Sequence, residues 1–475
     1  MSNHTGERRP RGNISPYHEF VAYSVGGIGV NTINSLFGYV GLSANCLLLG
    51  SAYGIAPMDL AIMSLVMSIL NLVKMPFISM LVDNTNTKWG KFRPYLLFTG
   101  VPTSVLLIVM AFIPNSINYT VKCVLLSLVY ALLMIFQSLY ALAFTSLAQV
   151  LTPNGEERTS LLSISQFIYS LGPSIVNLFF PIFAGLFEGG MTGFVSYRVL
   201  FPIFSIFGIV LSFWTFHGTE EKIVVPKNYV AHVRFVDGIS EIKSNKYFWL
   251  MTLYNVLGAL KGSIGSILSW YCIYAMDSEA MLGVMNAVLG TASVPGMLLA
   301  PFFAKKLGKR KSLIWFNLLR AVFAGLMLVT TKSPVLFLGC LYFANVCIGG
   351  DGVMGSAMTA DVFDYQQWKT GKRLEGFITQ FSGMLLTGAT MGLNLILPWF
   401  YEHYGLGNDY TVLYQEAVRT PIFNVMIIIS VISCVAAVIP ILFYDMTEKK
   451  QQMMIEDLKV RAAEEDRKAE IIAGE

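Results

Sequence analysis

Charged residues are scarce in this chain. Of its 475 residues only 13% are Asp, Glu, Lys or Arg, whereas about a quarter of a soluble globular domain is charged. Hydrophobic residues make up 55% of the sequence. A chain of this composition cannot cover a folded core with a polar, water-facing surface, so we exclude a soluble globular protein.

Cysteine and histidine are also few, and neither residue type shows the spacing of a metal site or a catalytic site. The six cysteines lie in apolar stretches without metal-ligand spacing, which predicts neither a disulfide nor a metal site. The five histidines fall in polar tails or near the ends of apolar stretches. Glycine runs at 26–29 and 349–352 predict close helix packing or local unwinding rather than a phosphate-binding loop. We therefore expect no cofactor and no enzymatic activity.

Long apolar runs recur along the chain instead. A helix needs about 20 apolar residues to cross the hydrocarbon of a membrane. The sequence predicts an all-α integral membrane protein with twelve transmembrane helices. The polar first sixteen residues hold no apolar core before a cleavage site, so we expect no cleaved signal peptide. The predicted spans are 19–47, 59–82, 94–114, 120–150, 159–187, 197–218, 246–275, 280–304, 313–331, 335–364, 375–401 and 419–444.

The longest internal polar stretch, 217–246, divides these spans six and six. Pro76-Phe77 and Pro301-Phe302 each precede a loop that contains Gly-Lys, which suggests two parallel repeats, although chance similarity between membrane loops is the alternative. Repeats of this kind place a solute site at their interface near the bilayer midplane. The predicted divisions are a tail at 1–18, a six-helix half at 19–218, a linker at 219–245, a six-helix half at 246–445 and a tail at 446–475.

The basic residues predict the orientation of the chain. Most of the 33 lysines and arginines fall in the two tails and in the loops on the same side as the tails. By the positive-inside rule both termini are then cytoplasmic, in a multi-pass protein of the inner (plasma) membrane. This topology accounts for the net charge of +4, so we expect no nucleic-acid partner. We expect a lipid-embedded protein that works as a monomer.

Two motifs resemble those of a known family. Trp89-Gly-Lys-Phe-Arg-Pro94 and the stretch that begins at Ala360-Asp361 resemble loops of the glycoside–pentoside–hexuronide:cation symporters, the melibiose-permease family. The resemblance implies the major facilitator fold with two six-helix halves. It also implies import of a sugar or glycoside by alternating access, commonly coupled to sodium or proton entry.

The chain departs from this family where the family binds its cation and sugar. The resemblance puts Asn71 and Met75 at the two second-span carboxylates, and Asn31 at the first-span acid. It puts Gln166 at the fifth-span arginine and Thr387 at the eleventh-span lysine. Because a hard cation needs anionic oxygen ligands, we expect transport without sodium, either uncoupled or with a co-transported proton.

Four charged residues, Lys74, Lys261, Arg320 and Asp351, lie well inside predicted spans, where such residues are candidates for function. Arg320 either reaches the cytoplasmic interface or pairs with Asp351, and Lys74 either replaces the metal ion of the family as a fixed ammonium or binds solute. Lys261 has no carboxylate three or four residues away, so we expect an anionic ligand to be its missing partner, unless it loses its proton. The excess of positive charge predicts an anionic solute such as a uronide or a sulfonated sugar.

Uncharged polar residues extend the predicted binding site. Several lie three apart and so share a helix face. Trp270 and Tyr274 lie four apart and either stack on a sugar ring or form an interfacial aromatic belt. The predicted solute-binding residues are Asn31, Asn34, Asn71, Lys74, Gln137, Tyr140, Gln166, Tyr169, Lys261, Trp270, Tyr274, Asp351 and Thr387.

Charged residues in the cytoplasmic loops predict a gate. Such charges at the ends of facing helices pair only when that side is closed. The predicted gating residues are Asp83, Lys88, Lys91, Arg93, Asp361, Asp364, Arg373 and Glu375. A lipid or lysolipid carrier of the same fold is the alternative function, and a sensor would need a soluble output domain. The sequence leaves the exact solute, the coupling ion and the stoichiometry open.

Overall fold

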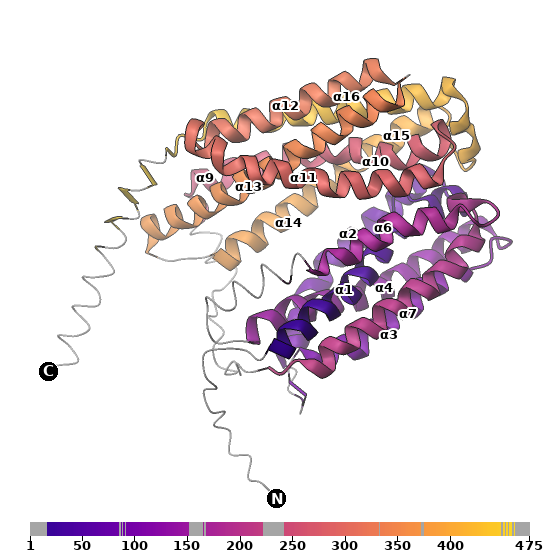
Figure 1. Cartoon of the computed structure of the whole chain (residues 1–475). Coiled ribbons are helices and arrows are strands. Elements are labelled where there is room, and N and C mark those ends of the chain that lie inside the picture. Colours follow the sequence, from indigo (N-terminus) through magenta and orange to yellow (C-terminus); the bar gives the residue numbers. More distant parts are fainter. Residues whose placement is uncertain are drawn as a thin grey trace, which may run out of the picture. The chain divides into compact units, whose positions relative to one another are not determined.

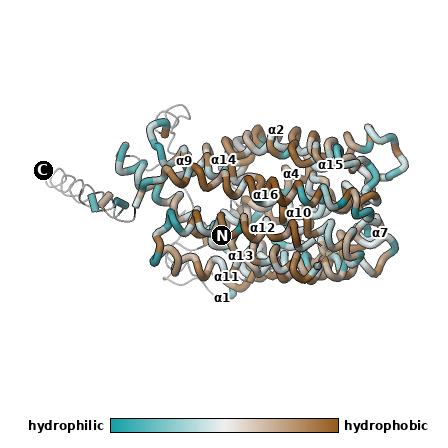
Figure 2. The backbone as a smooth tube through the Cα atoms, turned by 90° about the horizontal axis from the view of Figure 1, so that it is seen from above, coloured by the Kyte–Doolittle hydropathy of each residue, from teal (hydrophilic) through white to brown (hydrophobic). Residues whose placement is uncertain are grey.

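The computed structural model consists of helices joined by short connections (Figure 1). It describes residues 17–84, 87, 89–90, 92–151, 165, 168–221, 242–331, 333–371, 375–447, 450–451, 453–454, 456–457 and 460. Within this part of the chain, ten helices are long and apolar enough to cross a membrane. The hydrophobic colour runs along the helices, whereas hydrophilic colour gathers in the connections at helix ends (Figure 2).

The helices lie where the apolar runs predict them. Two further helices, α1 and α6, correspond to the first and fifth predicted spans. The elements of the first predicted half are α1 (Tyr17–Gly38), η1 (Leu47–Ala52), α2 (Pro57–Asn84), α3 (Arg93–Phe112), α4 (Tyr119–Val150), α6 (Leu171–Ala184), η2 (Gly190–Thr192) and α7 (Phe194–Gly218).

The second predicted half differs from the expectation of continuous helices in two places. Its seventh and eleventh spans are each divided into shorter helical segments. Gly258 and Gly262 lie at the break in the seventh span, where glycine lowers the cost of leaving α-helical geometry. The elements are α9 (Lys246–Leu257), η3 (Ala259–Gly262), α10 (Ser263–Trp270), η4 (Tyr271–Ala275), α11 (Glu279–Leu307), α12 (Lys309–Thr330), α13 (Pro334–Thr370), α14 (Glu375–Leu393), α15 (Ile396–His403), η5 (Tyr410–Tyr414) and α16 (Glu416–Leu442).

The described residues belong to two compact units. Unit 1 falls within Met1–Val230, Ser269–Ala287 and Tyr401–Glu416. In it α1 packs along α7, α3 packs against α4 and α7, and α6 packs against α1. Gly29 of α1 faces α7 so closely that a Cβ there would lie 2.7 Å from the Leu211 Cβ. Glycine thus allows the close approach of these two helices.

Unit 2 falls within Ala231–Leu268, Val288–Phe400 and Ala417–Glu475. In it α12 packs along α13, and α9 packs against α13 and α14. Gly349 of α13 lies against the backbone of α11, where a Cβ would come within 3.0 Å of the Met297 nitrogen. The second glycine run therefore serves close packing, and α13 stays helical through it.

Large apolar side chains remain exposed along the helices. Leu298 of α11 and Val329 of α12 are 75% and 78% exposed. A soluble monomer rarely exposes apolar surface on this scale. The exposed faces fit a lipid environment, as the sequence predicts for a multi-pass membrane protein.

Candidate functional site

Unit 1 contains a cavity of about 290 Å³ between α1, α2 and α4. We call it the Lys74 cavity. Its volume is close to the lower end of those in which proteins bind small molecules, about 300 Å³. The residues that line it are Phe37, Leu42, Ser64, Met67, Ser68, Asn71, Lys74, Tyr130, Met134, Gln137 and Ser138.

Lys74 is held inside this cavity by neutral oxygen atoms. Its Nζ donates to the Met134 carbonyl at 2.9 Å and to the Ser138 Oγ at 2.5 Å. The residue is 7% exposed, and no described carboxylate lies within ion-pair distance of the Nζ. An ammonium has three N–H donors, so one remains for a ligand. The cavity thus holds a buried positive charge that the described part of the protein does not neutralise.

Three predicted amide residues lie near this charge. Asn71 lines the cavity one turn before Lys74 on α2, and Gln137 lines it from α4. The Gln137 Nε2 donates to the Asn34 Oδ1 of α1 at 3.3 Å. Asn31 points differently, because its Nδ2 donates to the Gly27 carbonyl of its own helix at 2.9 Å. The structure therefore brings Asn34, Asn71, Lys74 and Gln137 together.

Tyr140 and Tyr169, two other predicted binding residues of unit 1, do not line the cavity. Tyr140 is fully buried and packs against Gly100, where a Cβ would lie 2.8 Å from its ring. Tyr169 is half-buried and meets Phe144 edge-on, with ring centroids 5.6 Å apart. Gln166 lies outside the described residues.

Trp270 and Tyr274 lie in an aromatic cluster of unit 1. The Trp270 ring is fully buried and packs against Tyr401, with centroids 5.2 Å apart. Tyr274 packs against Tyr414, and its Oη lies 2.5 Å from the Ser51 Oγ. These rings contact other protein side chains, and their part in solute binding stays a prediction.

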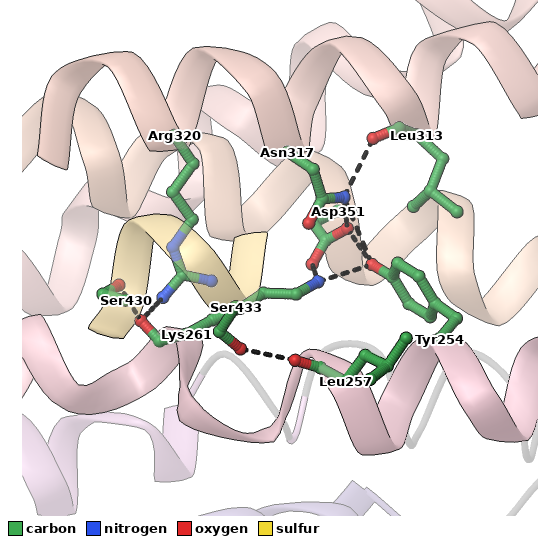
Figure 3. Close-up of polar contacts among 9 residues, drawn as sticks. All are labelled: Tyr254, Leu257, Lys261, Leu313, Asn317, Arg320, Asp351, Ser430 and Ser433. Carbon is green, nitrogen blue, oxygen red and sulfur yellow. Dashed lines mark hydrogen bonds and ion pairs between the residues drawn. The ribbon is translucent and has the colours of Figure 1, made fainter. Parts of the chain in front are cut away.

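Lys261 has a partner that the sequence did not reveal. Its Nζ lies 3.3 Å from the Asp351 Oδ2 of α13 and donates to the Tyr254 Oη at 3.0 Å (Figure 3). Asp351 also accepts from Tyr254, and from the Asn317 Nδ2 at 2.6 Å. The expectation that Lys261 lacks a carboxylate partner is wrong, because only residues on its own span were considered. The structure removes the missing-partner argument for a bound anion, and Lys261 as a solute ligand stays a prediction.

Side chains near this network also donate hydrogen bonds to backbone carbonyls at the break in the seventh span. The Lys261 carbonyl accepts from the Arg320 guanidinium and from the Ser430 Oγ, both at 2.8 Å. The Leu257 carbonyl accepts from the Ser433 Oγ at 2.6 Å. These donors satisfy carbonyl groups that a continuous helix would bond internally. Arg320 is thus buried beside the break, and Asp351 forms its ion pair with Lys261 rather than with Arg320.

Two predicted gating residues have partners within their own unit. The Arg93 guanidinium donates to the Phe216 carbonyl at the end of α7. Asp361 pairs with Lys309 at 2.7 Å. Asp364, a third predicted gating residue, is half-buried on α13. Thr387, which was predicted to bind solute, lies on α14, and its hydroxyl donates to the Gly383 carbonyl of the same helix. Lys88, Lys91 and Arg373, and the side chains of Asp83 and Glu375, lie outside the described residues, so the gate stays a prediction.

Sequence reasoning missed several residues that surround Lys74. Ser64 and Ser68 precede Asn71 and Lys74 at helical spacing and line the same cavity. These four residues form a polar stripe on an apolar span. A search for polar residues at the helical period of 3.6 residues could have predicted that Ser64 and Ser68 share the face of Lys74. Ser138 gave no such signal, because its contact with Lys74 joins α4 to α2.

The family model of MFS/sugar transport proteins matches residues 22–448, which is most of the chain. The chain belongs to this family. As an MFS/sugar transport protein it is a multi-pass secondary transporter of sugar or glycoside type, and not an enzyme. The resemblance to the glycoside–pentoside–hexuronide symporters is confirmed.

Individual relatives agree with this assignment. The isoprimeverose transporter of Lactiplantibacillus pentosus is 25% identical, over 98% of both chains. A putative 2,3-dihydroxypropane-1-sulfonate exporter of Escherichia coli (strain K12) is also 25% identical, over 78% of this chain and 80% of the relative. A crystal structure of the D-xylose-proton symporter matches with a TM-score of 0.59 at 12% identity, covering 89% of this chain and 97% of that one. The last likeness concerns the fold, which is that of the major facilitator superfamily.

Proposed function

We propose that this MFS/sugar transport protein imports a sugar-like solute with an acidic group, and that Lys74 binds this group. The observation that carries the proposal is the buried ammonium in a polar cavity without a described carboxylate partner. An ionised side chain within a membrane span is costly unless it meets water, a partner or a ligand. A carbonyl and a hydroxyl orient the Lys74 ammonium but do not neutralise it.

The rest of the Lys74 cavity suits a polyhydroxylated anion. Ser64, Ser68, Asn71 and Gln137 offer hydroxyl and amide groups that donate and accept hydrogen bonds. Phe37 and other apolar residues of the lining can contact the ring carbons of a sugar. The name of the sulfonate-exporting relative gives an anionic polyol as its solute, which supports the same class here.

We further propose that transport does not require sodium, because Lys74 occupies the place of the cation. The Met134 carbonyl and the Ser138 hydroxyl are oxygen ligands of the kind that a hard cation prefers, and here they bind an ammonium. Asn71 supplies no carboxylate beside them. A fixed positive charge thus stands in the region to which the resemblance assigns a mobile cation. Cytoplasmic termini and inward transport are parts of the same proposal.

The test measures dissociation constants of the purified protein for two matched sugars, methyl β-glucuronide and methyl β-glucoside. The two differ only in a carboxylate that replaces a hydroxymethyl group. A charged hydrogen bond contributes about 1.5–3 kcal/mol, so Lys74→Met should weaken glucuronide binding about ten- to a hundredfold. Binding of the neutral glucoside should hardly change.

Lys122→Met is the matched control. Lys122 is equally buried in unit 1 and donates to the Tyr53 carbonyl and the Asn115 Oδ1, but it does not line the cavity. Its loss should leave the preference for the glucuronide unchanged. The proposal is wrong if Lys74→Met weakens both sugars equally or weakens neither.

A further inference from the structure

Unit 1 has a second cavity, of about 280 Å³, beside the C-terminal end of α1. We call it the Tyr39 pocket. Besides α1 and the segment that follows it, α6, α10 and α11 contribute to its walls. Its polar residues include Ser35, Tyr39, Asn45, Asn177, Ser269 and Asn286. The resemblance and the sequence pattern assign no role to any of them.

Two buried polar atoms of this pocket have no hydrogen-bond partner among the described residues. They are the Tyr39 Oη and the Asn45 Oδ1. Buried polar groups of folded proteins are nearly always paired, and an unpaired one is costly. Both residues line the same pocket, so we infer that a molecule bound there bonds to both atoms.

The chemistry of the wall selects the kind of molecule. The described residues that line the pocket include no charged side chain. The Tyr39 hydroxyl can donate and accept, whereas the Asn45 Oδ1 only accepts. The Asn286 Nδ2 donates to the Asn177 carbonyl at 3.4 Å, which leaves its own carbonyl oxygen for a ligand. A neutral polyol matches these groups, whereas an ionised group would be buried here without a counter-charge.

The Tyr39 pocket and the Lys74 cavity lie on different sides of the end of α1. Ser35 and Tyr39, four residues apart, line the pocket, whereas Phe37 lines the Lys74 cavity. Ser35 and Phe37 lie two positions apart on α1, so their side chains point to different sides of the helix, and the two linings share no residue. The two cavities therefore offer separate sites, one neutral and one positively charged.

We propose that the Tyr39 pocket is a second solute site, which binds neutral polyhydroxylated molecules such as unmodified pentosides and hexosides. The proposal rests on the sugar-like class of solute, but not on the role of Lys74. Tyr39 and Asn45 bind hydroxyl groups of the neutral sugar. The protein thus takes neutral and acidic sugars at different places.

The test measures binding of a panel of neutral methyl pentosides and hexosides, with methyl β-glucuronide as the acidic comparison. Loss of one neutral hydrogen bond should weaken the neutral glycosides about three- to tenfold in Tyr39→Phe and in Asn45→Leu. Glucuronide binding should not change in either variant. Lys74→Met should show the reverse pattern, so the two proposals can fail independently.

Thermal unfolding without ligand separates binding from folding. The Tyr39 hydroxyl has no protein partner among the described residues, so Tyr39→Phe should keep the Tm of the wild type. Tyr53→Phe is the matched control, because the Tyr53 Oη donates to the Met110 and Ile113 carbonyls and its loss should lower the Tm. The proposal is overturned if no neutral glycoside binds at millimolar concentration, or if Tyr39→Phe leaves their affinity unchanged. It is also overturned if Tyr39→Phe lowers the Tm as far as Tyr53→Phe does.

Discussion

Lys74 and Lys261 are both buried in predicted membrane spans, yet their surroundings differ. Lys261 forms an ion pair with Asp351, and Tyr254 and Asn317 bond to the same carboxylate. Lys74 has neutral acceptors only among the described residues. A buried charge with a protein partner is compensated within the fold, whereas a buried charge without one is a candidate for binding a ligand of opposite charge. This contrast moves the predicted anion site from Lys261 to Lys74.

The Lys261–Asp351 pair should act as a structural clasp at the break in the seventh span. Removing one partner of a buried ion pair typically costs about 3–5 kcal/mol, because the other charge stays buried without compensation. Lys261→Met and Asp351→Asn should therefore each lower the Tm strongly, and the double variant should lose much less than the sum. Thermal unfolding in lipid nanodiscs measures these changes. Additive losses would argue against the clasp, as would weakened glucuronide binding at an unchanged Tm in Lys261→Met.

The sequence predicted part of the site at residue scale. Asn71 and Lys74 lie three residues apart and so share a helix face, and Gln137 was among the predicted solute-binding residues. The Lys261–Asp351 pair could not be predicted in this way, because the residues lie 90 positions apart on different helices. The ring neighbours of Trp270 could not be predicted for the same reason, since Tyr401 and Tyr410 come from a distant segment.

At the scale of elements, the apolar runs predicted the helices well because membrane thickness fixes their length. The ends of α3, α7 and α12 fall within a few residues of the predicted spans. The divided seventh and eleventh spans were missed, because an apolar run reads the same whether or not its helix is broken. Gly258 and Gly262 were the signal for the first of these breaks.

Two glycines at close helix contacts should be intolerant of alanine. A Cβ at Gly29 would press on α7, and one at Gly349 would press on α11. Overpacking of this kind costs about 1–3 kcal/mol, so Gly29→Ala and Gly349→Ala should lower the Tm. At Gly325 of α12 an added Cβ would have nothing within 4 Å. Gly325→Ala should therefore keep the free energy of unfolding of the wild type or raise it by up to about 1 kcal/mol, and its Tm should not fall. Equal Tm values for all three variants would show that these helices do not depend on close contact.

At the scale of the whole molecule, composition and span count predicted an all-α membrane protein, and the two loop motifs predicted its family. The fold is that of the major facilitator superfamily, and the chain is an MFS/sugar transport protein. The solute and the driving ion could not be predicted in the same way, because they depend on a few side chains at which this chain departs from its relatives. Asn71 and Lys74 are the departures on which the account of transport rests.

The most direct test of this account is exchange of methyl β-glucuronide across proteoliposomes in sodium-free buffer. The wild type should exchange the labelled glucuronide, because we propose that the fixed ammonium of Lys74 replaces a sodium ion at the site. Lys74→Met should exchange it far more slowly under the same conditions, whereas Lys122→Met should behave like the wild type. An absolute requirement for sodium in the wild type, or undiminished exchange by Lys74→Met, would contradict the account.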